Sequence, residues 1–127
     1  MQMTEMIDVV QARAGIDSNE TANETLIAVA ETLSERDLDG AQENFAAQLP
    51  EELGSVVKKG EKKDREKFDA EEFVSRVGER LGTSQRDTQA RTHAALSTMV
   101  EAVTEGEQLD LLNALPKDFT PYAVWNA

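Results

Sequence analysis

The chain contains no cysteine, only three prolines and 5% aromatic residues. Without cysteine it cannot form a disulfide or offer a thiolate to a metal or a substrate. It has no apolar run close to the ~20 residues that cross a bilayer, and no charged-then-apolar leader of the secretory type. We therefore expect a cytoplasmic protein that does not bind a membrane.

Positive charge is also scarce, because 13 lysine and arginine residues face 25 aspartate and glutamate residues and leave a net charge of −12. Nucleic acids are not expected as partners, since affinity for phosphates comes from clustered cations. The acid excess has two interpretations. It keeps a protein soluble in any cell, or it adapts the protein to a salt-rich cytoplasm, where dense carboxylates stay hydrated. Salt adaptation predicts a melting temperature that climbs with added potassium chloride.

What the chain does contain is a pattern that occurs twice. Residues 6–57 and 73–123 carry it at an offset of 67 residues, which becomes 66 after one gap. A repeated unit indicates one architecture built by duplication. Each copy alone is small for a stable core, so we expect residues 1–127 to form a single domain in which the copies pack on each other. The matched pairs include Arg13 with Arg80, Gly15 with Gly82, Thr21 with Thr88, Thr25 with Thr92, and Leu49-Pro50 with Leu115-Pro116.

Almost every segment has the apolar spacing of a helix, so the predicted fold class is all-α, with two tandem four-helix units packed as one globule. The helices expected in the first copy are 4–14, 18–34, one from Asp39 and one from Pro50. Those expected in the second copy are 69–81, 84–103, one from Thr104 and one from Pro116.

The helix ends are marked by capping residues. Ser18, Asp69 and Ser84 each offer a side-chain oxygen to an amide without a partner in its own helix, and glycine favours the left-handed conformation that ends a helix. Asp39 is expected to start a helix with Gln42 as its capping-box partner. Pro121 stands where the first copy has Ser55, which predicts a shorter or broken last helix.

The joint between the copies, residues 58–67, carries five of the six lysines of the chain. Its six cations against three acids give a net charge of +3, which leaves −15 on the rest of the chain. It has no apolar residue before Phe68, which is typical of a solvated linker that lies against the acidic body. The alternative is a docking strip for an anionic partner, with Lys58, Lys59, Lys62 and Lys63 as candidate binding residues.

Three blocks of the sequence resemble one known family. They are Phe73–Gly82 and Leu115–Phe119 in the second copy, and Phe45–Leu53 in the first. In this order they are similar to the domain-of-unknown-function family 2267, small bacterial and archaeal proteins, over nearly the whole chain. The resemblance implies an all-helical cytoplasmic protein without assigned activity, and it supplies no catalytic residues.

Residues with chemical potential are few. His93 is the single histidine, and its pattern favours a partly buried side chain bonded to a neighbour over a pH sensor or general base. One histidine excludes the usual two-histidine zinc sites. Asp37-Leu38-Asp39-Gly40 lacks the later ligands of a calcium loop, so helix capping explains it better. No phosphate-binding glycine loop or acid–base pair is present at motif spacing. We therefore expect no enzyme, no cofactor and no metal.

The aromatic residues gather at the C-terminal end, where Tyr122 and Trp125 either pack on the body or anchor a partner. The predicted function is a protein–protein interaction or adaptor module whose partner is an unknown protein. Self-association as a homodimer is left open. The alternative is a small-molecule-binding protein, with its ligand in the groove between the copies near Thr92 and His93.

Overall fold

The computed structural model describes residues 1–59 and 62–126, and it confirms the all-α class. The α-helices are α1 (Met3–Ala14), α2 (Asn19–Glu35), α3 (Gln42–Gln48), α4 (Glu51–Val57), α5 (Ala70–Leu81), α6 (Gln85–Glu101), α7 (Glu105–Ala114) and α8 (Thr120–Ala123). Two 3-10 turns, η1 (Lys62–Asp64) and η2 (Lys117–Phe119), complete the regular structure, and the described residues form no strand.

The capping residues explain where the helices begin and end. Ser18 and Ser84 accept hydrogen bonds from the amides of the third residue after them, and Asp69 does the same for Glu72 at 2.9 Å. These bonds satisfy amides that have no partner inside the helix. Gly15 and Gly82 follow α1 and α5 at φ 67° and 66°, the left-handed conformation that ends a helix at low cost for glycine.

The third helix starts later than the sequence predicts. Asp39 has φ 53° and Gly40 has φ 89°, so neither residue is helical, and α3 begins at Gln42. The side chain of Gln42 donates to the carbonyl of Arg36 at 2.6 Å, so it ties α3 to the end of α2 and does not act as a capping-box partner. The left-handed backbone therefore overrides a capping pattern that looks valid in the sequence.

The break expected in the last helix is present. Pro50 precedes the continuous helix α4, whereas Pro116 precedes the short turn η2 and then the four-residue helix α8. Pro121 lies in the first turn of α8, where its missing amide hydrogen is not needed. The chain thus restarts a helix near Pro121, which explains the division.

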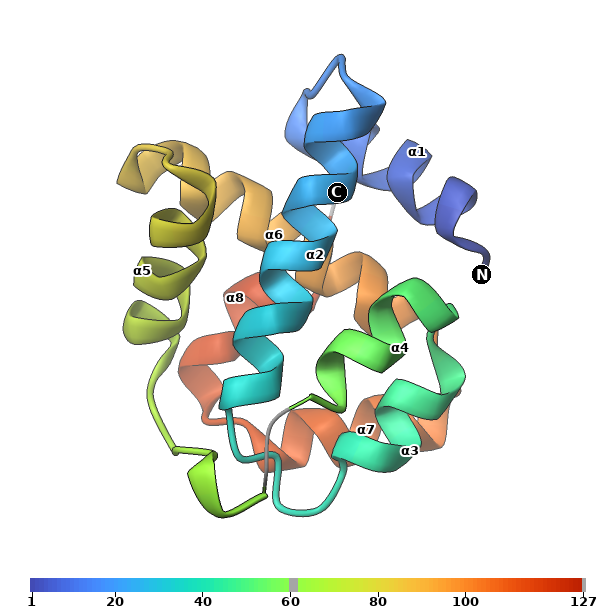
Figure 1. Ribbon diagram of the computed structural model, residues 1–127, viewed down its shortest axis with the longest axis vertical. Helices are drawn as coiled ribbons and strands as arrows, with labels where there is room; N and C mark the ends of the chain where they lie inside the picture. The colour runs from blue at the N-terminus through green and yellow to red at the C-terminus, as the bar shows by residue number, and fades with distance from the viewer. Residues whose placement is uncertain (60–61, 127) are drawn as a thin grey trace.

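The two longest helices, α2 and α6, pack together at the centre of the molecule (Figure 1). α1 and α5 lie on opposite sides of α2, and each of them packs on both long helices. α4 packs on α2 as α8 packs on α6, and α3 meets α7. The contacts that α1 and α4 make with the long helices therefore have counterparts in the contacts of α5 and α8.

The element bounds follow the offsets seen in the sequence. α1 and α5 are 67 residues apart at both ends, and α4 is 66 residues from the η2–α8 segment. Duplication as the origin of this match stays a prediction. Both halves contribute to one cluster of buried apolar residues, which includes Leu26, Phe45, Phe73, Leu96 and Phe119. Burial of that cluster is the main force that holds the halves together.

The joint between the halves is tied to the body. Residues 60 and 61 of the predicted 58–67 linker lie outside the described residues. Beyond them, the amide of Glu66 donates to the carbonyl of Glu35 at 2.9 Å, and the amide of Asp37 donates to the carbonyl of Glu66 at 2.8 Å. Lys67 pairs with Asp39 at 2.8 Å. The end of the joint therefore lies against the end of α2.

Among the helices within residues 1–59 and 62–126, none is both long and apolar enough to cross a bilayer.

Candidate functional site

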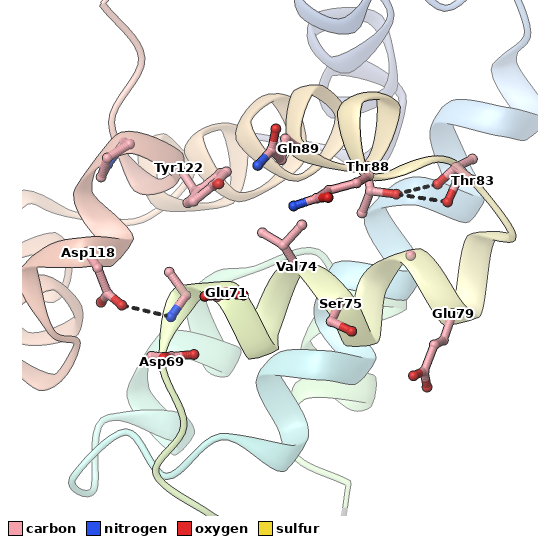
Figure 2. Close-up of a pocket in the computed structure, with 14 residues that line it drawn as sticks. Asp69, Glu71, Val74, Ser75, Glu79, Thr83, Thr88, Gln89, Asp118 and Tyr122 are labelled. Atoms are coloured by element: carbon pink, nitrogen blue, oxygen red, sulfur yellow. Dashed lines mark hydrogen bonds between the residues drawn. The ribbon is translucent and has the colours of Figure 1, made fainter.

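An open cleft of about 1060 Å³ lies between α5, the first half of α6, and the η2–α8 segment. All of its residues belong to the second half of the chain. In Figure 2, Val74, Thr88 and Tyr122 lie in the space between α5 and α6, whereas Glu79 points away from α6 at the rim. The lining consists of Asp69, Ala70, Glu71, Val74, Ser75, Gly78, Glu79, Thr83, Gln85, Thr88, Gln89, Asp118, Pro121 and Tyr122.

One face of α5 forms the longest wall of this cleft. Its lining residues recur at the three- and four-residue steps that keep side chains on one side of a helix. Val74 is buried and points across the cleft toward α6, while Tyr122 projects from α8 into the same space (Figure 2). These two side chains and Pro121 provide apolar surface between the polar ends.

The two ends of the cleft are held by hydrogen bonds. At one end, the amide of Ala70 donates to Oδ2 of Asp118 at 3.0 Å, which joins the start of α5 to η2 (Figure 2). At the other end, the hydroxyl of Thr88 donates to the carbonyl of Ser84 at 2.7 Å and lies 2.6 Å from the hydroxyl of Thr83. The cleft is therefore bordered by fixed elements at both ends.

Gly78 allows α5 to approach α6 closely. A Cβ atom at this position would lie 3.1 Å from Oγ1 of Thr88 and 3.4 Å from its Cγ2, which is tighter than ordinary contact. The two helices consequently diverge from this point toward the start of α5, where the cleft opens around Val74 and Tyr122. A larger side chain at position 78 would push the walls apart.

The cleft is strongly acidic. Four carboxylates line it, and its lining contains no lysine, arginine or histidine. Asp69 and Asp118 each accept a backbone amide, whereas Glu71 and Glu79 have no hydrogen bond or ion pair with any residue that the structure describes. The unneutralised carboxylates give the cleft a negative potential.

The corresponding surface of the first half differs. In register, Gln2, Thr4 and Ala12 stand where the cleft has Asp69, Glu71 and Glu79. Acids occur at only two of the corresponding positions, Asp8 and Glu52. A smaller space of about 300 Å³ lies there, lined by Met1, Gln2, Met3, Thr4, Pro50 and Glu52. The large acidic cleft is thus a feature of the second half.

The structure brings one predicted site residue into the cleft and places another elsewhere. Tyr122 lines the cleft, but Trp125 lies half-buried with its ring 4.5 Å from the ring of His93. The guanidinium of Arg13 lies 4.9 Å from the Trp125 ring centre. Nε2 of His93 lies 2.8 Å from the carbonyl of Val124, and because a carbonyl only accepts, this nitrogen carries the proton. The C-terminal segment therefore packs across both halves.

The other predicted binding residues lie away from the cleft. Thr92 is fully buried, and His93 is covered by the C-terminal segment. Neither residue lines the acidic cleft or the smaller space of the first half. Lys58, Lys59, Lys62 and Lys63 are exposed at and after the end of α4. Their roles in ligand or partner binding stay predictions.

Asp37 and Asp39, outside the cleft, have structural partners. The amide of Asp39 donates to Oδ1 of Asp37 at 2.9 Å, and Asp39 pairs with Lys67. The hydrogen bond from Lys67, followed by its charge, holds the pKa of Asp39 below its usual range. Within the described part of the chain, no three histidine or acidic side chains are grouped as a metal site would require.

The described residues form an all-helical protein with a large acidic cleft. The chain matches the family model described as an uncharacterized conserved protein (DUF2267) over residues 3–122, and it belongs to that family. The resemblance inferred from the three sequence blocks is thereby confirmed. No protein of curated function matches the sequence significantly.

Sequence reasoning missed most of the cleft residues. No motif distinguishes Glu71, Glu79, Asp118 or Val74 from the other charged and apolar residues of the helices. A usable signal was present, since the first copy carries Thr4 and Ala12 where the second carries Glu71 and Glu79. Differences between matched copies, more than their shared residues, point to this surface.

Proposed function

We propose that this protein is a non-catalytic interaction module that binds a cationic segment of a partner protein in the α5–α6–α8 cleft. The observation that carries the proposal is the lining itself, which contains four carboxylates and no cationic side chain; Glu79 stands at its rim and also borders a second cleft with Arg76 and Arg80. Electrostatic complementarity of this kind favours positively charged partners and disfavours negatively charged ones.

The shape of the cleft supports binding as well as attraction. Val74, Pro121 and Tyr122 supply apolar surface between the acidic ends. Removal of such surface from water provides affinity, while carboxylates at the rim provide selectivity and faster association. The net charge of −12 acts in the same direction, because it attracts cationic partners over longer distances.

A binding role accounts for the polar groups better than catalysis does. Hydroxyl nucleophiles need a neighbouring base within hydrogen-bond reach. Thr88 donates to a backbone carbonyl, and the hydroxyl of Thr83 lies against that of Thr88. Among the described residues, no hydroxyl that lines the cleft donates to a carboxylate or a histidine. We also propose that the protein works in the cytoplasm and that its acidic surface is adapted to high salt.

Two predicted alternatives have less support. A small molecule near Thr92 and His93 would have to displace the C-terminal segment, since Val124 and Trp125 cover His93. The lysine strip for an anionic partner has exposed side chains at Lys58, Lys59 and Lys62, but it lies on a molecule whose charge repels anions.

The proposal is tested by affinity capture from the native host with three forms of the protein. Glu71→Gln/Glu79→Gln removes the two unpaired carboxylates of the cleft. Glu24→Gln/Glu31→Gln is the matched control, because these exposed residues of α2 carry the same charge and lie outside the cleft. Partners should be recovered with the wild type and the control and be lost with the cleft variant. Equal recovery with all three forms would contradict the proposal.

The lysine strip is tested in the same experiment. A variant with glutamine at Lys58, Lys59 and Lys62 should keep the partners of the wild type. Loss of partners with this variant, together with full retention by the cleft variant, would favour the strip as the binding surface.

A further inference from the structure

We infer that the cleft receives its partner as an α-helix laid along α5, with an apolar residue at its centre and a basic residue on either side. This inference rests on the proposed function and names the form of the partner segment. It follows from the backbone of the walls, from the length of the α5 face and from the positions of the carboxylates.

The walls cannot pair with an extended backbone. An extended segment needs unpaired amide and carbonyl groups beside it, as at the edge of a sheet. The cleft is walled by helices, whose backbone groups bond within the helix, and the described residues contain no strand. The isolated bridge that the described residues form, between Arg36 and Glu66, lies outside the cleft. A helical partner satisfies its own backbone and needs only side-chain contacts.

The length of the wall suits about three helical turns. The α5 lining runs from Ala70 to Glu79, which at 1.5 Å per residue corresponds to about 14 Å. Glu71 and Glu79 are eight residues apart, or about 12 Å along the axis. Because eight residues turn the helix by about 80° beyond two full turns, Glu79 stands at the rim of the cleft. A long basic side chain of the partner, seven or eight positions from the one at Glu71, reaches it there.

The apolar surface falls between these charges. Val74 lies on α5 between Glu71 and Glu79, and Tyr122 projects from α8 into the same space (Figure 2). A side chain midway between two basic residues of the partner, three or four positions from each, would contact both. Lysine and arginine suit the flanking positions, because their methylene stems cover apolar surface while their charged ends reach the rim.

The acidic charge is uneven along the cleft. Asp69, Glu71 and Asp118 gather around the start of α5, whereas Glu79 stands near its end. The amino-terminal end of a helix carries partial positive charge. The partner helix should therefore place its amino-terminal end near Asp69 and run in the same direction as α5.

The inference is tested with three fluorescein-labelled peptides of about 18 residues, long enough to form a helix, in an alanine- and glutamine-rich background. The helical probe has one central leucine, one lysine four positions before it and one lysine four positions after it, so that all three side chains lie on one face. The scrambled probe has the same composition, with leucine opposite the lysines. The proline probe is the helical probe with one background residue near its centre replaced by proline, which breaks the helix.

Fluorescence anisotropy should show one helical probe bound per protein chain, at least about tenfold more tightly than the other two probes, a difference of ~1.4 kcal/mol. Circular dichroism should show added helix on binding. Glu71→Gln/Glu79→Gln should weaken the helical probe by about tenfold, and the Glu24→Gln/Glu31→Gln control should change it by less than about twofold.

Failure of the inference is distinguishable from failure of the proposed function. Equal binding of all three probes, weakened equally in the cleft variant, would overturn the helical form and leave a cation-binding cleft in place. Probes that bind the wild type and the cleft variant equally would overturn both. A second copy of the chain is the remaining occupant. Sedimentation showing a dimer of the wild type and a monomer of the cleft variant would assign the cleft to self-association and overturn the inference.

Discussion

Arg80 reaches from α5 to Glu35 on α2, where Nη2 lies 3.0 Å from Oε2 and joins the two halves of the molecule. Nη1 of the same guanidinium donates to the hydroxyl of Thr32 at 2.9 Å. The corresponding residue of the first half, Arg13, donates to Oε1 of Glu101 on α6 at 2.8 Å. Each arginine thus bonds to the long helix of the other half, and the two ion pairs connect the halves.

Replacement of Arg80 should weaken the connection between the halves and destabilise the fold. We expect Arg80→Met to lower the free energy of unfolding by about 1–2 kcal/mol, because the variant loses two charge-assisted contacts that are partly shielded from solvent. Equilibrium unfolding in urea measures the loss. The control is Arg86→Met, since Arg86 is exposed and has no ion pair among the described residues. An equal loss in both variants would show that the contacts to α2 do not matter.

The same ion pair predicts a dependence of stability on pH. Burial by itself would raise the pKa of Glu35, but the hydrogen bond and charge of Arg80, followed by those of Arg76, outweigh it and hold the pKa below 4.5. A carboxyl whose pKa is lower in the folded state stabilises the fold above its unfolded pKa. That contribution is lost as the pH falls through the folded value.

Wild type and Glu35→Gln should therefore differ most near neutral pH and converge in acid. After allowance for solvent screening of this partly exposed side chain, the difference should reach no more than about 1 kcal/mol at pH ~7, and it should shrink as the pH falls below the usual pKa range of a glutamate. Urea unfolding at several pH values provides the measurement. A difference that stays constant from about pH 7 to about pH 3 would contradict the role of the ionised carboxylate.

The fold could be predicted from the sequence where local signals and packing agree. The capping serines Ser18 and Ser84 and the glycines after α1 and α5 set helix ends that the structure confirms. The start of α3 could not be predicted, because it depends on a left-handed backbone at Asp39. The buried contact from Gln42 to Arg36 becomes visible only when the end of α2 is in place.

Two glycines show how position decides the effect of the same substitution. Gly54 in α4 faces the backbone of α3 so closely that an added Cβ would collide with the carbonyl oxygen of Ala46. Gly106, in the first turn of α7, has no atom within 4 Å of an added Cβ. We expect Gly54→Ala to destabilise by about 2–3 kcal/mol and Gly106→Ala to stabilise by about 0.5–1 kcal/mol.

Thermal melting of the two variants, checked by urea unfolding, measures these opposite effects. Each variant is the control for the other, because both replace glycine in a helix by the best helix former. A gain of stability in Gly54→Ala would mean that α3 and α4 move apart at little cost.

The cleft was harder to predict than the fold. Tyr122 was singled out because aromatic residues are scarce, and it does line the cleft. Glu71 and Glu79 look like ordinary surface charges, and Thr88 looks like a repeat of Thr21. What makes them one surface is the divergence of α5 and α6 beyond Gly78, which no local pattern specifies.

Thr25 and Thr92 occupy matching positions and differ in hydrogen bonding. Both are fully buried, but the hydroxyl of Thr25 donates to the carbonyl of Thr21 at 2.8 Å, whereas that of Thr92 has no partner among the described residues. A buried hydroxyl without a partner is costly. We expect Thr92→Val to raise the free energy of unfolding by about 1 kcal/mol and Thr25→Val to lower it by about 0.5–1 kcal/mol. Urea unfolding of the pair tests this, and an equal loss in both variants would contradict it.

The acid excess predicts a response to salt that separates its two interpretations. With a net charge of −12, repulsion among carboxylates opposes the folded state, and salt screens it. We expect the melting temperature to climb by roughly 5–10 °C between about 0.1 and 2 M potassium chloride, which corresponds to about 2 kcal/mol. Glu71→Gln/Glu79→Gln should melt higher than the wild type at low salt, because it removes two carboxylates from one crowded surface, and should lose that advantage at high salt. A melting temperature that does not respond to salt would leave solubility as the role of the acidic surface.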